Sequence, residues 1–148
     1  MVRGGSCFYF LNSMEFAIIV AVMQTDLIKK GQIVEKPWGY EIIWAHTERY
    51  VGKILHINKG ESLSYQYHVV KDETIRLLSG ALEIDIETSG DRSKLRLSPG
   101  DCLHIVPRMK HRMIAIEDCD VLEVSTPELE DVVRLEDRYG RADSGSNK

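Results

Sequence analysis

The sequence lacks long apolar runs and has few cysteines. The longest uninterrupted apolar run, Phe16–Met23, is far shorter than the ~20 residues that a membrane-spanning helix requires. The cysteines Cys7, Cys102 and Cys119 are odd in number and show no Cys-x-x-Cys spacing. This argues against a disulfide framework and favours a reducing compartment. We therefore expect a cytoplasmic protein with no membrane partner.

The sequence also lacks an excess of positive charge and any internal repeat. Its formal net charge is -4 and its pI is about 5.7, whereas binding to nucleic acid phosphates needs a basic face. We therefore expect no nucleic acid partner. With 148 residues, of which 43% are hydrophobic and 28% charged, the chain has the size and composition of one soluble globular domain.

The N-terminal residues differ in pattern from the rest of the chain. Glu15 interrupts their apolar stretch, and no small-x-small cleavage site follows Met23, so a secretory signal is not favoured. We expect residues 1–23 to be an extension, with Met14 or Met23 as another start. Residues 24–141 are then a single domain and residues 142–148 a disordered tail.

From Lys36 onward, short apolar runs alternate with turn residues, which predicts many short strands and an all-β sandwich or barrel. Alternation is clear at Leu82, Ile84 and Ile86, which share one face. One short C-terminal helix is expected at Pro127–Glu136. The expected strands are Tyr40–Ala45, Gly52–Ile57, Ser62–Tyr67, Thr74–Leu78, Ala81–Ile86, Lys94–Leu97, Cys102–Val106, Met113–Ile116 and Val121–Ser125.

Four polar residues within this framework have the types and spacing of metal ligands. Gln66 and His68 are two residues apart, so they face the same side of a strand. Glu73 opens the next strand after a short connection, and His111 follows a later bend. Two imidazoles, a carboxylate and an amide oxygen suit Zn²⁺, Fe²⁺, Mn²⁺ or Ni²⁺. By spacing alone, a solvated surface hairpin is an equal alternative.

Two motifs resemble those of the cupin superfamily. The first is Gly60-x5-Gln66-x-His68-x4-Glu73-x6-Gly80, with Gln66 in place of the usual first histidine. The second is Pro99-Gly100-Asp101-x4-Val106-Pro107-x3-His111, with Arg108 where glycine is common. More narrowly, the chain resembles the C-terminal cupin domain of type II mannose-6-phosphate isomerase / mannose-1-phosphate guanylyltransferase. Flanking stretches carry this likeness: Lys36-Pro37-Trp38-Gly39-Tyr40-Glu41 and Val133-Arg134-Leu135-Glu136-Asp137-Arg138-Tyr139-Gly140-Arg141.

The resemblance implies a jelly-roll fold and a divalent metal, with Zn²⁺ favoured, held by Gln66, His68, Glu73 and His111. It implies interconversion of mannose 6-phosphate and fructose 6-phosphate through an enediol, in carbohydrate precursor metabolism. The chain departs from the family at Val69-Val70-Lys71, where histidine and arginine are usual. It also has no glycine-rich nucleotidyltransferase signature.

An isomerase of this kind needs a base and cations for the phosphate. Lys53 lies at a position where relatives carry lysine, Arg134 lies in the family-like C-terminal stretch, and His104 is a candidate base. We predict catalytic roles for these three residues; each has the alternative of a structural or surface role. Arg112 and Arg141 are further cationic candidates.

Other functions are compatible with the same ligand set. The chain could be a non-catalytic, metal-containing cupin that binds or senses a sugar, or an Fe²⁺-dependent cupin oxygenase. In each case we expect a small-molecule ligand and a homodimer, because an open sheet edge invites pairing with a second copy.

Overall fold

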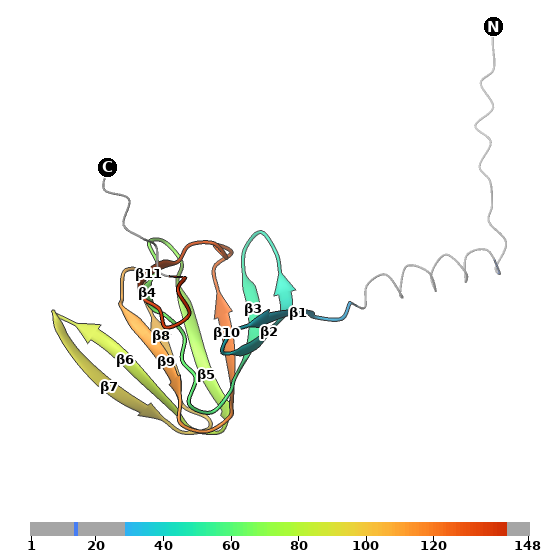
Figure 1. The fold of residues 1–148 in the computed structure, drawn as a ribbon. Helices are drawn as coiled ribbons and strands as arrows, with labels where there is room; N and C mark the ends of the chain where they lie inside the picture. Colours follow the sequence, from blue (N-terminus) through green and yellow to red (C-terminus); the bar gives the residue numbers. More distant parts are fainter. Residues whose placement is uncertain (1–13, 15–28, 142–148) are drawn as a thin grey trace, which may run out of the picture. The chain divides into compact units, whose positions relative to one another are not determined.

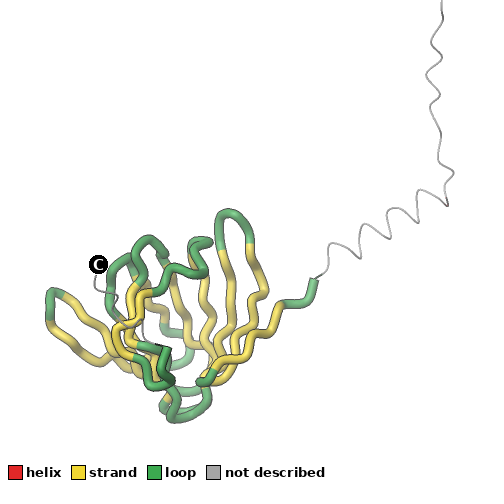
Figure 2. The backbone as a smooth tube through the Cα atoms, turned by 45° about the horizontal axis from the view of Figure 1, so that its top comes forward, coloured by secondary structure: helices red, strands yellow, loops and turns green. Residues whose placement is uncertain are grey.

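A computed structural model describes Met14 and residues 29–141. Residues 29–141 form two antiparallel sheets that lie face to face (Figures 1 and 2) and contain no helix. The larger sheet, in the order β1-β2-β3-β10-β5-β8, consists of β1 (Gln32–Lys36), β2 (Gly39–His46), β3 (Val51–Ile57), β10 (Cys119–Ser125), β5 (Glu73–Ser79) and β8 (Cys102–Ile105). The smaller, in the order β11-β4-β9-β6-β7, consists of β11 (Val133–Glu136), β4 (Tyr65–Tyr67), β9 (His111–Ala115), β6 (Leu82–Thr88) and β7 (Asp91–Leu97).

The core lies between the two sheets. Along β6, Leu82, Ile84 and Ile86 are buried, as the alternation predicts. They pack in one cluster with residues of the larger sheet, among them Ile75 and Leu77 of β5. Burial of apolar side chains such as these is the dominant favourable contribution to folding.

The all-β prediction is confirmed, and each of the nine expected strands is present with small shifts of its ends. The helix expected at Pro127–Glu136 is wrong: residues 127–132 form turns and Val133–Glu136 is β11. β11 pairs with β4, with Val133 opposite Tyr67. Two adjacent valines favour a strand, and the open edge of β4 supplies backbone partners that a sequence pattern does not reveal.

Two turns have a left-handed backbone, one after the far end of β5 and one in the bend before β9. Gly80 has φ 81° and lies so close to the Asp118 carbonyl oxygen that a Cβ there would be 2.1 Å from it. Arg108 has φ 69° although it is not a glycine. This conformation explains why glycine is common at this position in proteins with the second motif.

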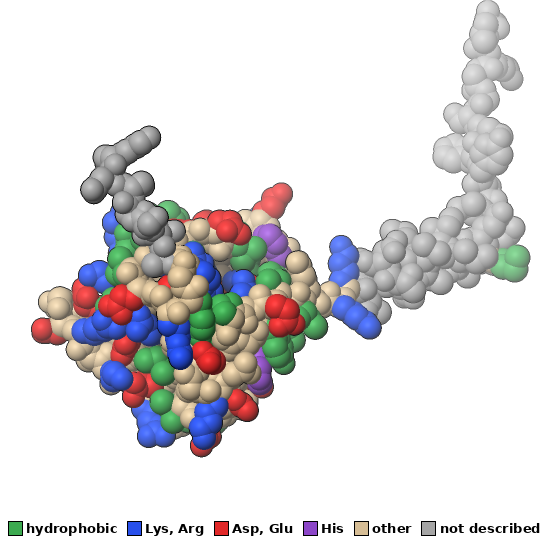
Figure 3. Space-filling view, in the orientation of Figure 1, with side chains coloured by type: hydrophobic (Ala, Val, Ile, Leu, Met, Phe, Trp, Pro, Cys, Tyr) green, Lys and Arg blue, Asp and Glu red, His purple; other side chains and the backbone are tan. Residues whose placement is uncertain are grey.

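The chain divides into two compact units, residues 1–30 and residues 31–148, and the sandwich belongs to the second. The boundary expected after residue 23 and the tail at residues 142–148 lie outside the described residues. Within the described part of the chain, no helix has the length and apolarity needed to span a membrane. Figure 3 shows Lys and Arg side chains interspersed with Asp and Glu on the face of the sandwich it presents.

Candidate metal site

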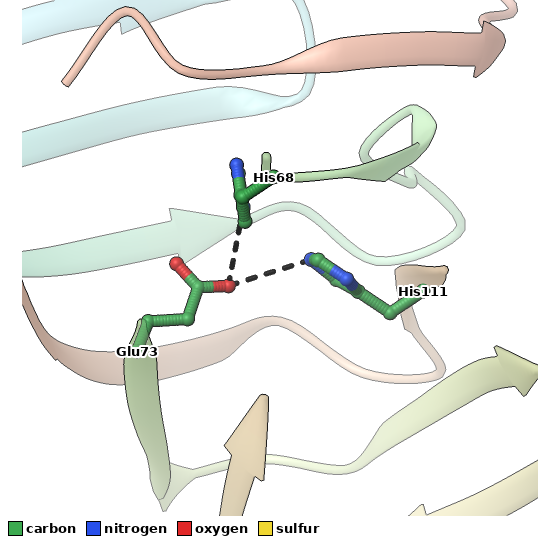
Figure 4. Close-up of side chains that lie close together, drawn as sticks. All are labelled: His68, Glu73 and His111. Carbon is green, nitrogen blue, oxygen red and sulfur yellow. Dashed lines mark ion pairs between the residues drawn. The ribbon is translucent and has the colours of Figure 1, made fainter. Parts of the chain in front are cut away.

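Three buried polar side chains converge inside the sandwich. His68 follows β4, Glu73 opens β5 and His111 opens β9; they are 3%, 2% and 2% exposed. Glu73 Oε1 lies 3.5 Å from His68 Nε2 and 3.4 Å from His111 Nε2. Dashed lines in Figure 4 mark these two contacts. One ligand atom from each residue fits within a 4.8 Å cluster. The structure thus brings together three of the four predicted ligands.

Backbone carbonyl groups fix the tautomer of both histidines. His68 Nδ1 donates to the Asp131 carbonyl oxygen, and His111 Nδ1 donates to the Met109 carbonyl oxygen at 3.0 Å. A neutral imidazole protonated at Nδ1 has its lone pair on Nε2. Both Nε2 atoms are buried without a hydrogen-bond partner. This is the arrangement of metal-ligating histidines, whose second nitrogen is held by an outer partner.

Gln66 lies beside this cluster. It is directly opposite His111 in the pairing of β4 with β9, and it lines the same cavity. Ser64 Oγ donates to Gln66 Oε1 at 2.6 Å. Because an amide oxygen has two lone pairs, this bond leaves one for a further interaction. Gln66 as the fourth ligand remains a prediction.

The electrostatics of the cluster favour a cation. Burial by itself would raise the pKa of Glu73, but contacts with His111 and His68 and the charge of Lys71 hold that pKa well below its usual value. An ionised carboxylate with two neutral imidazoles suits Zn²⁺, Fe²⁺, Mn²⁺ or Ni²⁺. The residues present therefore fit the divalent metal that the sequence predicts.

The cluster opens into a cavity of about 460 Å³ whose wall carries a row of alternating charges. Glu41 lies between Lys36 and Lys53, at 2.9 Å and 3.5 Å. Glu123 lies between Lys53 and Lys71, at 3.9 Å and 2.9 Å. Lys71 also pairs with Glu73. The row therefore runs from the edge strand β1 to the candidate metal ligands.

The three residues at which the chain departs from the family motif, Val69-Val70-Lys71, differ in their exposure. Val69 and Val70 are exposed, whereas Lys71 is only 5% exposed and points into the cavity. Burial by itself would lower the pKa of Lys71, but the carboxylates of Glu123 and Glu73 raise it above its usual value. Lys71 therefore adds a fixed positive charge beside the cluster.

Of the three predicted catalytic residues, the structure places two at the cavity. Lys53 and Arg134 line it. His104 is exposed on the outer face of β8 and bonds to Asp72 at 3.0 Å, because its neighbour Ile105 takes the inward position. The proposed site therefore does not include His104.

The two further cationic candidates, Arg141 and Arg112, also differ in whether they line the cavity. Arg141 lines the cavity and pairs with Asp137 at 2.7 Å. Arg112 pairs with Glu136 at 2.7 Å and lies over the ring of Tyr65, and it is not among the residues that line the cavity. Only Arg141 therefore stays close to the site.

Sequence reasoning missed two cavity carboxylates and one loop residue. Glu41 and Glu123 are buried at inward positions of β2 and β10. A charged residue at such a position was the available signal, but strand parity could not be fixed from the sequence. Asp131, which holds His68, lies in a segment that was expected to be helical, so its contacts could not be foreseen.

The fold and site define a class, and comparison with known proteins agrees with it. Residues 53–125 match the family described as the cupin domain. An antiparallel two-sheet sandwich with a His-Glu-His cluster inside has the character of this family. The chain therefore contains a cupin domain, and the jelly-roll fold predicted by resemblance is confirmed.

Among curated proteins, the chain is similar to two bacterial enzymes. It is 31% identical over 115 residues to mannose-1-phosphate guanylyltransferase ManC of Salmonella typhimurium, which covers 73% of this chain and 23% of that protein. The mannose-1-phosphate guanylyltransferase of Escherichia coli matches with the same values. The chain thus spans less than a quarter of the length of either relative.

Solved structures show the same fold. KdgF from Halomonas sp. has a TM-score of 0.59 and 25% identity, covering 68% of this chain and 91% of its own. The capsular polysaccharide assembling protein CapF from Staphylococcus aureus has a TM-score of 0.60 and 18% identity, covering 77% of this chain and 35% of its own. Oxalate decarboxylase has a TM-score of 0.61 and 18% identity, covering 70% and 30%.

Proposed function

We propose that this chain is a metal-dependent isomerase of phosphorylated sugars, similar to mannose-6-phosphate isomerase. The observation that carries the proposal is the buried cluster of His68, Glu73 and His111, which opens into a charged cavity. The likeness to two mannose-1-phosphate guanylyltransferases supports a mannose phosphate as the substrate.

Under this proposal, His68, Glu73, His111 and Gln66 hold a divalent ion, with Zn²⁺ favoured over Fe²⁺, Mn²⁺ and Ni²⁺. When bound, the ion would supply a Lewis acid for the carbonyl and hydroxyl oxygens of the sugar. The protein's own ligands fix its place, because the backbone holds both imidazoles through Nδ1.

Moving a proton between two adjacent carbons needs an acceptor near the substrate. Besides Glu73, the cavity offers two buried carboxylates, Glu41 and Glu123. Lys53 lies between them, at 3.5 Å and 3.9 Å. We assign proton transfer to one of these carboxylates, and we assign Lys53 to its orientation and to contact with the sugar.

The substrate phosphate needs a cation at the cavity wall. Arg134 lines the cavity and belongs to β11, directly opposite Gln66 on β4. A guanidinium group can bind two phosphate oxygens at once. We therefore assign Arg134 to the phosphate, with Arg141 as a second cation on the cavity wall.

The test measures bound metal and isomerase turnover in the same samples. Purified protein is loaded with each metal, its metal content is determined, and conversion of mannose 6-phosphate is followed in a coupled assay. We expect one ion per chain and turnover that falls by at least about 100-fold in Lys53→Met. His104→Ala is the matched histidine control and should retain both metal and activity.

The remaining outcomes separate the alternatives. One bound ion without turnover would overturn the isomerase proposal in favour of a cupin that binds or senses a sugar. Consumption of oxygen with the iron-loaded protein would favour an oxygenase. The homodimer and the cytoplasmic location also remain predictions, and sedimentation of the purified chain tests the first of them.

A further inference from the structure

The loop after β10 is bonded along its length to the segment that carries the metal ligands. At one end, Asp72 N donates to Thr126 Oγ1 at 3.1 Å, and Thr126 N donates to the Asp72 carbonyl at 3.0 Å. At the other end, β11 pairs with β4, with Arg134 opposite Gln66. The loop between these ends, residues 127–132, therefore lies against residues 67–72.

Asp131 makes the central contacts of this loop. Its carboxylate accepts three successive backbone N–H groups, from Val69 at 2.9 Å, Val70 at 2.7 Å and Lys71 at 2.8 Å. Its carbonyl oxygen accepts the Nδ1–H of His68. One residue thus holds both the turn that follows His68 and the imidazole of His68 itself.

A second loop holds His68 from another direction. Arg108 N donates to the His68 carbonyl oxygen at 2.6 Å. Arg108 lies in the bend that precedes β9, the strand that begins at His111. This bond fixes the backbone of His68 but not its ring. Rotation and tautomer of the ring depend on the contact with Asp131, since Nε2 has no hydrogen-bond partner among the described residues.

We propose that Asp131 is a positioning residue of the metal site: it holds His68 in the Nδ1-protonated tautomer with Nε2 directed toward Glu73. The inference rests on the proposed metal site for its functional meaning, but the effect on His68 exists without metal. The carbonyl group of residue 131 is present in every variant. The carboxylate matters because it ties that carbonyl to the turn at residues 69–71.

Loss of the carboxylate should act in two steps. Three backbone N–H groups lose their acceptor, so the turn and the loop separate. The carbonyl of residue 131 then leaves Nδ1 of His68, and the imidazole can protonate at either nitrogen. Outer partners of ligating histidines typically change metal affinity by ~10- to 100-fold, and we expect a loss in this range for Asp131→Ala.

The experiment uses the full chain as wild type, Asp131→Ala, Asp131→Asn and a matched control, Asp118→Ala. Asp118 also ties a distant segment through a backbone amide, accepting from Lys59 N at 2.7 Å, but it contacts none of the predicted ligands among the described residues. The His68 tautomer is read from ¹H–¹⁵N spectra of metal-free protein at about pH 8, where free imidazoles are neutral. Co²⁺ and Zn²⁺ dissociation constants are then measured, with circular dichroism as a check of folding.

We expect wild type and Asp118→Ala to show His68 protonated at Nδ1. Asp131→Ala should show a mixture of tautomers and weaker metal binding. Asp131→Asn keeps one acceptor oxygen, so it should fold like wild type and fall between the two. Asp131→Ala or Asp131→Asn with a wild-type tautomer and wild-type affinity, in folded protein, would overturn the inference.

The readouts separate this inference from the proposed function. If wild type binds no metal but Asp131→Ala still changes the His68 tautomer, the positioning role stands and the metal proposal fails. If all variants bind metal equally and the tautomer is unchanged, the metal proposal stands and the positioning role fails.

Discussion

The inner face of the larger sheet changes from charged to apolar within two residues along each central strand. On β3, Lys53 points into the cavity, and Leu55 packs in the core. On β10, Glu123 lies in the charged row, and Val121 is fully buried in the core. These residues occupy equivalent inward positions in a period of two. The sandwich therefore has a charged half and an apolar half built on the same strands.

This difference indicates what each half does. Burial of apolar side chains is the main source of folding free energy, and the apolar half supplies it. Buried ion pairs repay their desolvation only in part, so hydrophobic residues of similar volume are often as stable or more so. The charged half is therefore better explained by the chemistry of the cavity than by stability.

The largest expected loss of stability comes from removing one carboxylate, that of Glu123, from the charged row. Glu123→Leu leaves Lys53 and Lys71 without a shared carboxylate, and loss of one partner of a buried pair typically costs about 3–5 kcal/mol. Urea unfolding measures this change. The double variant Lys53→Met, Glu123→Leu leaves Lys71 with Glu73 and should recover most of the stability but not activity.

The control for this prediction is a surface pair. Glu83 lies 2.5 Å from Lys94 on the exposed side of the smaller sheet, so Glu83→Leu should cost only about 0–1 kcal/mol. A double variant as unstable as Glu123→Leu alone would contradict the view that the charged row is kept for function.

The apolar half should respond in stability alone. Leu77 is fully buried in the core, and Leu77→Ala is expected to cost about 2–5 kcal/mol because a cavity remains. Metal affinity of the folded variant should stay at the wild-type value. Val124 is 44% exposed on the outer face, and Val124→Ala serves as the control. A large loss of metal affinity in Leu77→Ala would show that the two halves are coupled.

The pH dependence of stability should come from the charged half. The pKa of Glu73 lies below its ordinary value of 4.5. A group with a lowered pKa in the folded state contributes stability above its unfolded pKa and loses it as pH falls through the folded value. With a chelator present, the free energy of unfolding should therefore fall below pH about 4.5. Glu73→Gln should flatten this fall, and equal slopes in the two proteins would contradict the assignment.

The smallest expected effect is a difference in thiol reactivity between the two described cysteines. Cys119 is buried in the apolar half, where burial raises the pKa of its thiol to about 12, whereas Cys102 is exposed. Because the thiolate is the reactive form, iodoacetamide should modify Cys102 in native protein and Cys119 only on unfolding. Peptide mapping by mass spectrometry measures both rates, and rapid native modification of Cys119 would show that the apolar half opens.

Nine of the eleven strands could be predicted because local turn and alternation patterns indicate them, and β1 and β11 are the exceptions. Turn residues separate the strands, and the motif spacing singled out His68, Glu73 and His111, which the fold brings together as a candidate metal site. β11 could not be predicted, because it depends on the distant edge of β4. The fold and the candidate metal site are therefore readable from turn patterns and motif spacing, whereas a strand that depends on a distant partner is not.

The charged row shows the limit of strand parity. On β10, Leu122 and Val124 are more apolar than Glu123 and Ser125, so hydrophobicity alone assigns the wrong side as inward. The inward side at this end is a cavity, and only the packing of two sheets reveals it. The same ambiguity affected His104, which lies one position away from the inward Ile105.

The central claim is that His68, Glu73 and His111, with Gln66, hold one divalent ion. Anomalous diffraction from crystals grown with Zn²⁺, recorded on both sides of the zinc absorption edge, tests it most directly. The account predicts one strong peak between these four side chains, and its loss in His111→Ala. Absence of a peak there in the wild-type protein, or stoichiometric binding retained in the double variant Gln66→Ala, His68→Ala, would contradict it.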